Sequence, residues 1–191
     1  MNSADLADRS TRSGAPVRIG SLCTGFGGLD LAIELVLGGQ LAWYAETERH
    51  ACTVLAHHWP DVANLGDIRT VDWSTVAPVD IITAGFPCQD ISNAGKRAGI
   101  TGVHSSVWTA VATAVRALRP AFVFVENVAA LLRRGLDVVH ADLATLGYDT
   151  SWVCLRASDI GAAHRRDRVF LLAVRADLLT ADAHPADAVR P

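Results

Sequence analysis

The sequence lacks the features that mark a membrane, secreted or metal-binding protein. No apolar run is long enough to cross a bilayer, and the polar residues 2–15 contain no apolar signal-peptide core. The four cysteines lie far apart without a CxxC pair, which is not a zinc pattern and, in an intracellular chain, not a disulfide framework. We therefore expect a globular protein of the cytoplasm that holds no metal.

Positive charge is also limited. Lysine occurs only once, at Lys96, and the formal net charge is −3. A negative chain has little general attraction for nucleic acid, so any such contact must come from a local patch. The 191 residues, half of them apolar, suffice for one domain with a sizeable core. We expect this domain at residues 17–176, between a disordered lead (1–16) and a flexible tail (177–191).

Strand and helix patterns alternate along the chain. Strands are expected at residues 17–22, 41–45, 62–65, 79–84, 121–125, 148–156 and 168–174. Helices are expected at residues 27–37, 48–58, 106–118 and 136–146. This alternation predicts an α/β fold with a doubly wound, mostly parallel, Rossmann-like sheet. The two adjacent strands at the end predict an antiparallel strand near residues 168–174.

The stretch Gly85-Phe86-Pro87-Cys88-Gln89 is the strongest candidate for chemistry. It follows an apolar strand, and its glycine and proline end that strand in a turn. The turn places Cys88 at the carboxyl edge of the sheet, where open α/β folds bind their ligands. A deprotonated cysteine is a strong nucleophile. A lone cysteine is more often a buried core residue, so the other segments must decide between these interpretations.

Three segments have the positions of a nucleotide-binding site. The first strand runs into the glycine-rich turn SLCTGFGG (21–28), although such turns also serve packing alone. Glu46 follows about twenty residues later, where a carboxylate accepts hydrogen bonds from ribose hydroxyls. Glu48 is better explained as an acid at a helix start. Asp67 could accept the amine of an adenine while Ile68 packs on the ring; by itself, Asp67 would be a turn residue.

An acid follows the strand at residues 121–125. Glu126 shares the sheet edge with Cys88, because both stand at carboxyl ends of strands, and it could donate a proton. The alternative is a helix at residues 128–133 that begins with Asn127 as its cap.

Basic residues precede the last strand, in the segment GAAHRRDR (161–168). Strand alternation would point Arg166 and Arg168 to one side, where two guanidinium groups suit a phosphate or a base carbonyl. An exposed charged hairpin is the alternative.

Together and in this order, the segments resemble the catalytic domain of the DNA C5-cytosine methyltransferases. The matching segments are SLCTGFGG, Glu46, Gly66-Asp67-Ile68, GFPCQ, Glu126-Asn127-Val128 and GAAHRRDR. GFPCQ followed by ENV at this distance is highly specific, and it overturns the buried-core interpretation of Cys88. The resemblance implies a catalytic methyltransferase domain that serves DNA methylation and restriction-modification in a bacterium or a phage.

The resemblance implies covalent catalysis on a cytosine that is flipped out of the DNA helix. The Cys88 thiolate would attack C6, while Glu126 would hold the N3 and N4 edge and protonate N3. Arg168, with Arg166 in support, would hold the pyrimidine carbonyl. C5 would then take the methyl group of S-adenosylmethionine, and loss of the C5 proton would release the cysteine.

The resemblance also implies a pocket for S-adenosylmethionine. Its expected residues are Phe26, Gly27, Gly28, Glu46, Asp67, Ile68, Pro87 and Val107. Ser92, Lys96 and Arg97 belong to a segment that resembles the family's closing loop over DNA. Cys23 stands where the family often has an aromatic residue against the cofactor, which predicts weaker binding.

The segment after Arg175 departs most from the family pattern. A target-recognition region and a final segment that completes the cofactor site are usual there, and nothing after Arg175 resembles either. The alternatives to an active enzyme are a non-catalytic remnant and one subunit of a split enzyme, whose partner chain carries the recognition region. A cysteine hydrolase is disfavoured, because no histidine is placed as a base beside Cys88.

Overall fold

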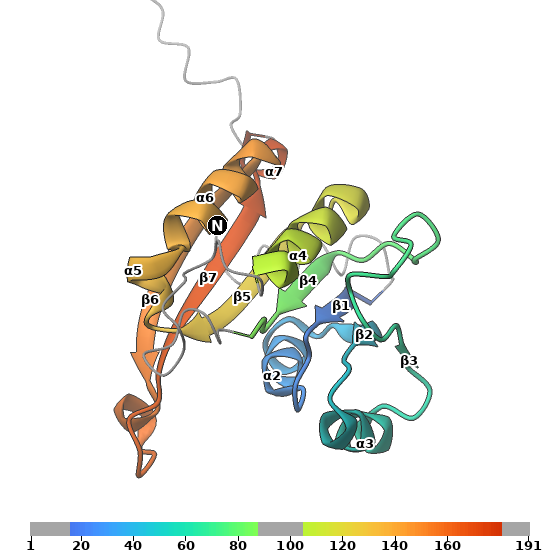
Figure 1. Cartoon of the computed structure of the whole chain (residues 1–191), viewed down its shortest axis with the longest axis horizontal. Helices are drawn as coiled ribbons and strands as arrows, with labels where there is room; N and C mark the ends of the chain where they lie inside the picture. Colours follow the sequence, from blue (N-terminus) through green and yellow to red (C-terminus); the bar gives the residue numbers. More distant parts are fainter. Residues whose placement is uncertain (1–15, 88–104, 181–191) are drawn as a thin grey trace, which may run out of the picture.

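The computed structural model describes residues 16–87 and 105–180. In this part of the chain seven strands form one sheet, in the order β3-β2-β1-β4-β5-β7-β6 (Figure 1). The strands are β1 (Arg18–Leu22), β2 (Gln40–Ala45), β3 (Ala63–Asn64), β4 (Ile81–Ala84), β5 (Phe122–Val128), β6 (Tyr148–Arg156) and β7 (Asp167–Arg175). All seven lie where the sequence predicted strands.

The sheet is mostly parallel. β1 lies between β2 and β4 and is parallel to both, and β5 is parallel to β4. β7 runs antiparallel to β5 and to β6. The predicted α/β fold, with an antiparallel strand at its end, is confirmed. Because Gly85 follows β4 and Glu126 lies near the end of β5, the parallel pairing puts both residues at one edge of the sheet.

Helices cover both faces of the sheet (Figure 1). They are α2 (Gly28–Leu37), α3 (Arg49–His58), α4 (Ser105–Leu118), α5 (Leu131–Arg134), α6 (Leu136–Thr145) and α7 (Ala176–Thr180). Among the described residues, none of these helices is both long and apolar enough to span a membrane.

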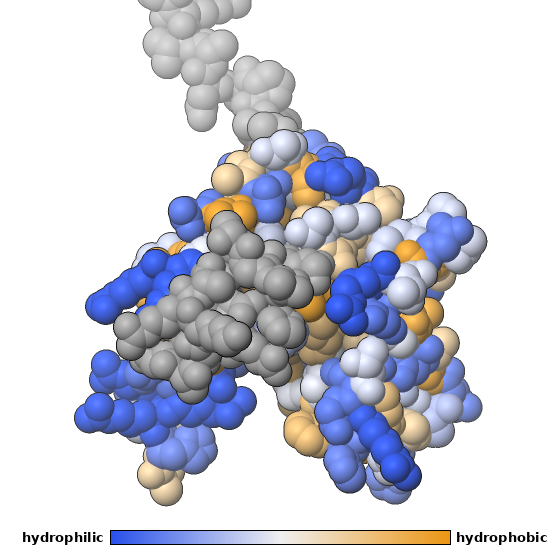
Figure 2. All heavy atoms as spheres, in the orientation of Figure 1, coloured by the Kyte–Doolittle hydropathy of each residue, from blue (hydrophilic) through white to orange (hydrophobic). Residues whose placement is uncertain are grey.

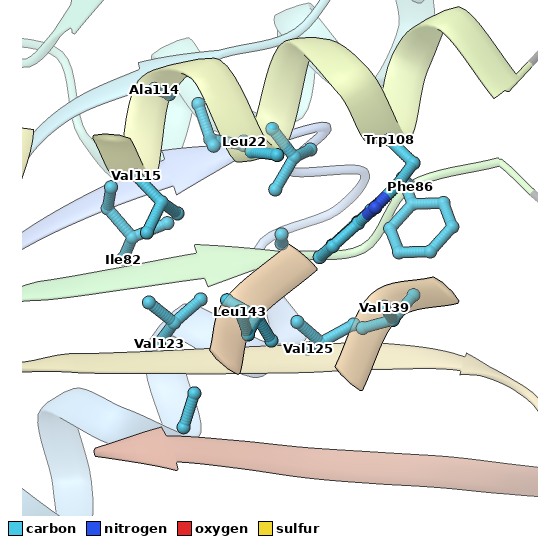
Figure 3. Packing of buried hydrophobic residues seen from close by; sticks show 14 of the residues in the cluster. Leu22, Ile82, Phe86, Trp108, Ala114, Val115, Val123, Val125, Val139 and Leu143 are labelled. Carbon is cyan, nitrogen blue, oxygen red and sulfur yellow. The ribbon is translucent and has the colours of Figure 1, made fainter. Parts of the chain in front are cut away.

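The larger apolar core lies between the sheet and helices α4 and α6. Trp108 of α4 and Leu143 of α6 pack there against side chains of the central strands, and Phe86 lies beside Trp108 (Figure 3). The ring centroids of Phe86 and Trp108 are 5.4 Å apart. This packing fixes the backbone just after β4, which leads into Pro87.

A second apolar cluster lies on the opposite face, under α2 and α3. Ile33 of α2 and Leu55 of α3 pack there with Ile81 of β4. Ile82, the next residue of β4, belongs to the larger core. Successive strand residues point to opposite faces, so a fully apolar strand is buried from both sides.

Two segments differ from their sequence-based interpretations. β5 continues through Val128, so Asn127 does not cap a helix at residues 128–133; it pairs with Val169 of β7 instead. α7 occupies residues 176–180, which include the start of the segment predicted to be a flexible tail. Residues 1–15 and 181–191 lie outside the described residues, so the predicted lead and the rest of the tail stay predictions.

Candidate functional site

Two adjoining cavities open at the carboxyl ends of the parallel strands. The first cavity, of about 460 Å³, is lined by the predicted residues Glu46, Asp67, Ile68, Pro87 and Val107. The second cavity, of about 520 Å³, is lined by the predicted residues Phe26, Gly28, Glu126 and Arg166. Cys23, Gly25 and Gly85 line both. The fold therefore brings segments that are distant in sequence to one continuous site.

Glu46 is held in the first cavity by backbone N–H groups. Its Oε2 accepts a hydrogen bond from the N–H of Gly25 at 2.7 Å. Its Oε1 accepts from the N–H groups of Thr47 and Glu48, each at 2.8 Å. The bond to Gly25 ties the end of β2 to the glycine-rich turn after β1. Oε2 can accept one further hydrogen bond, because only one of its two lone pairs is used.

Glu48 has the structural role that its position predicted. Its side chain caps α3 by accepting a hydrogen bond from the N–H of Ala51 at 2.7 Å. Hydrogen bonds from the backbone of Ala51 and His50 lower the pKa of Glu48. The interpretation of Glu48 as a helix-start acid is confirmed.

Asp67 is engaged by a neighbour that the sequence analysis did not single out. Arg69 donates from Nε to Oδ1 of Asp67 at 2.9 Å and from Nη2 to Oδ2 at 2.5 Å. These hydrogen bonds lower the pKa of Asp67. Arg69 also lines the first cavity, and Ile68, between the two in sequence, is buried. A ligand amine would have to share the Asp67 carboxylate with Arg69.

Glu126 and Arg168 form an ion pair at the second cavity. Arg168 Nε lies 2.6 Å from Glu126 Oε1, and the two side chains are 21% and 27% exposed. Gly85 faces this pair, since a Cβ added there would lie 4.0 Å from Glu126 Oε2. A planar guanidinium fixes the orientation of a carboxylate better than an ammonium does. The acid that sequence analysis selected is therefore held beside the turn that leads to Cys88.

Arg166 lines the same cavity, but strand alternation is not the reason. It lies just before β7 and has a left-handed backbone (φ 41°), so strand alternation does not set its direction. It nevertheless lines the second cavity with Glu126. The end of the β6–β7 hairpin around it projects beyond the sheet and is mainly hydrophilic (Figures 1 and 2).

Asn127 has a role that its sequence pattern did not reveal. Its Nδ2 donates to the carbonyl oxygen of Phe86 at 3.1 Å, and the residue is buried. This bond joins β5 to the backbone immediately before Pro87. The side chain of Glu126 thus lines the second cavity, while that of Asn127 holds the turn.

The glycine-rich turn requires glycine at one position in particular. Gly27 has φ 78° and precedes the first residue of α2. A Cβ on Gly27 would lie 2.6 Å from the ring of Trp59, which no side chain could occupy without a shift. Gly27 therefore shapes the turn, while its neighbours Phe26 and Gly28 line the second cavity.

Polar side chains that the sequence analysis passed over also line the second cavity. Asp30 is 1% exposed and accepts hydrogen bonds from Ser21 Oγ at 3.0 Å and Thr83 Oγ1 at 2.5 Å. Burial raises the pKa of Asp30 to about 6. The hydroxyl of Thr24 is buried without a hydrogen-bond partner among the described residues. The only sequence signal for Asp30 was an acid in the first turn of a mostly apolar helix, which also contains Glu34.

None of the described cysteines both lines the cavities and ionises readily. Burial and the nearby carboxylates of Glu46 and Asp67 raise the pKa of Cys23 to about 12. Cys52 donates its thiol to the carbonyl oxygen of Glu46 at 3.4 Å. Cys154 is exposed on the edge strand β6 and lines neither cavity. A thiol that stays protonated is a poor nucleophile, so Cys23 is unsuited to the role despite its position.

Several predicted residues lie outside the part of the chain that the structure describes. They are Cys88, Ser92, Lys96 and Arg97. Within the described ranges, no group of three or more His, Cys, Asp or Glu side chains could hold a metal ion.

Comparison with known proteins gives a consistent result. Residues 17–188 match the family described as C-5 cytosine-specific DNA methylase. The Type II methyltransferase M.NlaIV of Neisseria lactamica is 34% identical over 138 residues, which are 66% of this chain and 33% of that protein. M.HhaI of Haemophilus parahaemolyticus is 31% identical over 166 residues, which are 85% of this chain and 50% of that protein. The chain thus spans half or less of these relatives.

Solved structures share the fold. The S. pombe Dnmt2 methyltransferase superposes with a TM-score of 0.70 at 18% identity, over 91% of this chain and 58% of that chain. The Entamoeba histolytica methyltransferase EhMeth superposes with a TM-score of 0.72 at 15% identity, over 84% and 53%. At these identities the likeness concerns the fold, while the family match rests on the sequence. Since that match covers nearly the whole chain, the protein belongs to the C-5 cytosine-specific DNA methylase family.

Proposed function

We propose that this chain carries the catalytic machinery that moves a methyl group from S-adenosylmethionine to C5 of a flipped cytosine, through a covalent adduct with Cys88. One observation carries the proposal. The ion-paired Glu126, the anchored Glu46 and the glycine-rich turn line two adjoining cavities beside Pro87, the residue to which Cys88 is joined. An acid, a nucleophile and a nucleoside site are what the family reaction requires.

The residues present fit S-adenosylmethionine, which the family uses as its methyl donor. Glu46 would accept a hydrogen bond from a ribose hydroxyl, and Ile68, Pro87 and Val107 would enclose the adenine in the first cavity. The buried Thr24 hydroxyl, which lacks a partner among the described residues, supports a polar ligand group in the second cavity. Bound there, the cofactor would supply an electrophilic methyl group.

The chain's own residues would then perform the remaining steps. The Cys88 thiolate forms a bond to C6, and the displaced electron pair moves into the ring. Glu126 donates a proton to N3, which prevents a full negative charge on the base. Arg168 holds Glu126 by one N–H and the carbonyl oxygen of Asp167 by another at 3.0 Å. Its guanidinium has five N–H donors, so three remain for the base carbonyl.

The cycle closes when the adduct breaks. After C5 has gained the methyl group, a base removes its proton, the C5–C6 double bond re-forms, and the sulfur leaves C6 as a thiolate. The cytosine must be outside the helix throughout, because C6 cannot be reached within the base stack. Arg166 would assist by holding polar groups of the extruded nucleotide at the second cavity.

The proposal is tested by transfer of tritium from labelled S-adenosylmethionine to mixed-sequence DNA. Transfer is expected for the unchanged chain and for Cys154→Ser, an exposed cysteine that serves as the matched control. Cys88→Ser and Glu126→Gln are expected to lose it, by about 100-fold or more for the acid. Equal transfer by Cys88→Ser and the unchanged chain would contradict the proposal.

A second candidate is a split enzyme, in which a partner chain carries the recognition region. This chain covers 33% of M.NlaIV and 50% of M.HhaI. Specific reading of DNA needs several side chains in a groove. We therefore expect the isolated chain to prefer single-stranded or mismatched cytosine, with activity that falls steeply with salt. Specific methylation restored by a recognition region added in trans would support this candidate. The protein would act in the bacterial cytoplasm, whether a bacterium or a phage encodes it.

A further inference from the structure

Asp30 is a buried acid to which the reaction above gives no role. It stands in the first turn of α2 and is 1% exposed. Its carboxylate accepts hydrogen bonds from Ser21 of β1 and Thr83 of β4, and the residue lines the second cavity. One carboxylate thus connects α2, β1 and β4 just after the glycine-rich turn.

The surroundings of Asp30 hold no fixed counter-charge. Among the described residues, Asp30 has no ion pair with an arginine, lysine or histidine, and its two hydrogen-bond donors are neutral hydroxyls. Burial and the acid Glu34, one turn further along α2, raise the pKa of Asp30 to about 6. At neutral pH the group is therefore mostly ionised. Buried charges are usually paired with opposite charges. An ionised carboxylate that lines a cavity and has no positively charged partner therefore indicates a cationic ligand.

The other groups at this cavity agree with such a ligand. The Thr24 hydroxyl is buried without a partner and lines the same cavity as Asp30. Glu126 of β5 and Arg166 before β7 also line it, and Arg168 already pairs with Glu126. The Cys23 thiol, with its pKa raised to about 12, adds no charge at neutral pH. Among the described residues that line the second cavity, Asp30 is thus the acid that has no ion pair with an arginine.

We propose that Asp30 is the counter-charge for the sulfonium centre of S-adenosylmethionine. This inference rests on the proposed function, because it assumes that donor. The sulfur is positive before transfer and becomes a neutral thioether when the S–CH3 bond breaks and the methyl group joins C5. A fixed carboxylate therefore favours the methyl donor over the product, S-adenosylhomocysteine. Asp30 discriminates between the two bound states and makes no bond in the reaction.

The inference predicts a specific pattern of ligand affinity. Calorimetry would compare S-adenosylmethionine with S-adenosylhomocysteine on the whole chain and on Asp30→Asn, which keeps the size of the side chain. Asp30→Asn is expected to weaken binding of the sulfonium ligand about tenfold and that of the thioether less than about threefold. In the unchanged chain, affinity for the sulfonium ligand should also fall as the pH drops through about 6, because Asp30 becomes protonated. Asp30→Asn should lack this fall.

Two further variants separate charge from structure. Thr83→Val removes a hydrogen bond that lowers the pKa of Asp30 but keeps the carboxylate. At alkaline pH, where Asp30 stays ionised, both affinities should therefore change by the same factor. Glu34→Gln removes the neighbouring acid of α2, whose Oε1 accepts from the N–H of Leu41, and should leave the ratio of the two affinities unchanged. If Asp30→Asn weakened the binding of both ligands equally, the role of Asp30 would be wrong, while the proposed function would stand. Failure of both ligands to bind the unchanged chain would overturn the proposed function and this inference with it.

Discussion

The ionisation of Asp30 should make the stability of the fold depend on pH in an unusual direction. Most native carboxylates have lowered pKa values, but burial raises the pKa of Asp30 from 3.8 to about 6. Between these two values the folded state binds a proton that the unfolded state does not, so stability falls as the pH rises. Above about pH 6 both states are ionised and the loss is complete. The shift of about two pK units corresponds to about 3 kcal/mol at neutral pH.

Asp30→Asn removes this loss while it keeps the size and the hydrogen-bonding capacity of the side chain. One of the hydroxyls of Ser21 and Thr83 can turn to accept from the new amide, since a hydroxyl both donates and accepts. The linkage relation gives a penalty for the unchanged chain of about 1 kcal/mol at pH 4.5 and about 3 kcal/mol at pH 7.5. The stability of Asp30→Asn relative to the unchanged chain should therefore rise by about 2 kcal/mol between these pH values.

Urea unfolding at both pH values measures this quantity directly. The difference between the two proteins cancels all other titrating groups, because only position 30 differs. Glu34→Gln is the matched control on the same helix, and its relative stability should change much less with pH. The reasoning fails if the relative stability of Asp30→Asn stays constant within about 0.5 kcal/mol, or falls as the pH rises.

Three other changes test separate parts of the site. Glu46→Ala should weaken S-adenosylmethionine binding by about tenfold or more in calorimetry, because hydrogen bonds to a charged acceptor are lost; unchanged affinity would exclude the ribose role. Gly27→Ala should lower the unfolding free energy by about 2 kcal/mol or more, because it combines a left-handed backbone with a contact to Trp59, and a smaller loss would show that the turn can shift. Arg168→Lys should reduce methyl transfer by about tenfold or more, whereas Arg175→Lys at the other end of β7 should not, and equal effects would deny the pair with Glu126 a special role.

The fold was predictable because its signals are local and repeated. The central strands β1, β2, β4 and β5 are largely apolar runs, and parallel strands of this kind are buried on both faces. The alternation of such runs with amphipathic helices leaves few arrangements other than a doubly wound sheet. The end of β5 was harder to predict, because Asn127 is both a good helix cap and a buried partner for the carbonyl of Phe86.

The site was predictable where a motif marks it and hidden where only geometry does. Glu46 and Glu126 stand at strand ends, so strand order alone puts them at one edge. The engagement of Asp67 by Arg69 depends on a turn conformation that residue types do not specify. Asp30 was missed because its importance comes from burial between two strands that are far apart in the sequence.

The central claim is that Cys88 is the nucleophile of a cytosine C5 methyltransferase. Single-stranded DNA containing 5-fluorocytosine tests it most directly, because fluorine at C5 blocks the release of the cysteine. With S-adenosylmethionine present, peptide mass spectrometry should find one methylated fluorocytosine adduct, attached to the peptide that contains Cys88, and no adduct in Cys88→Ser. An adduct on Cys23, Cys52 or Cys154 that survives in Cys88→Ser would contradict the account.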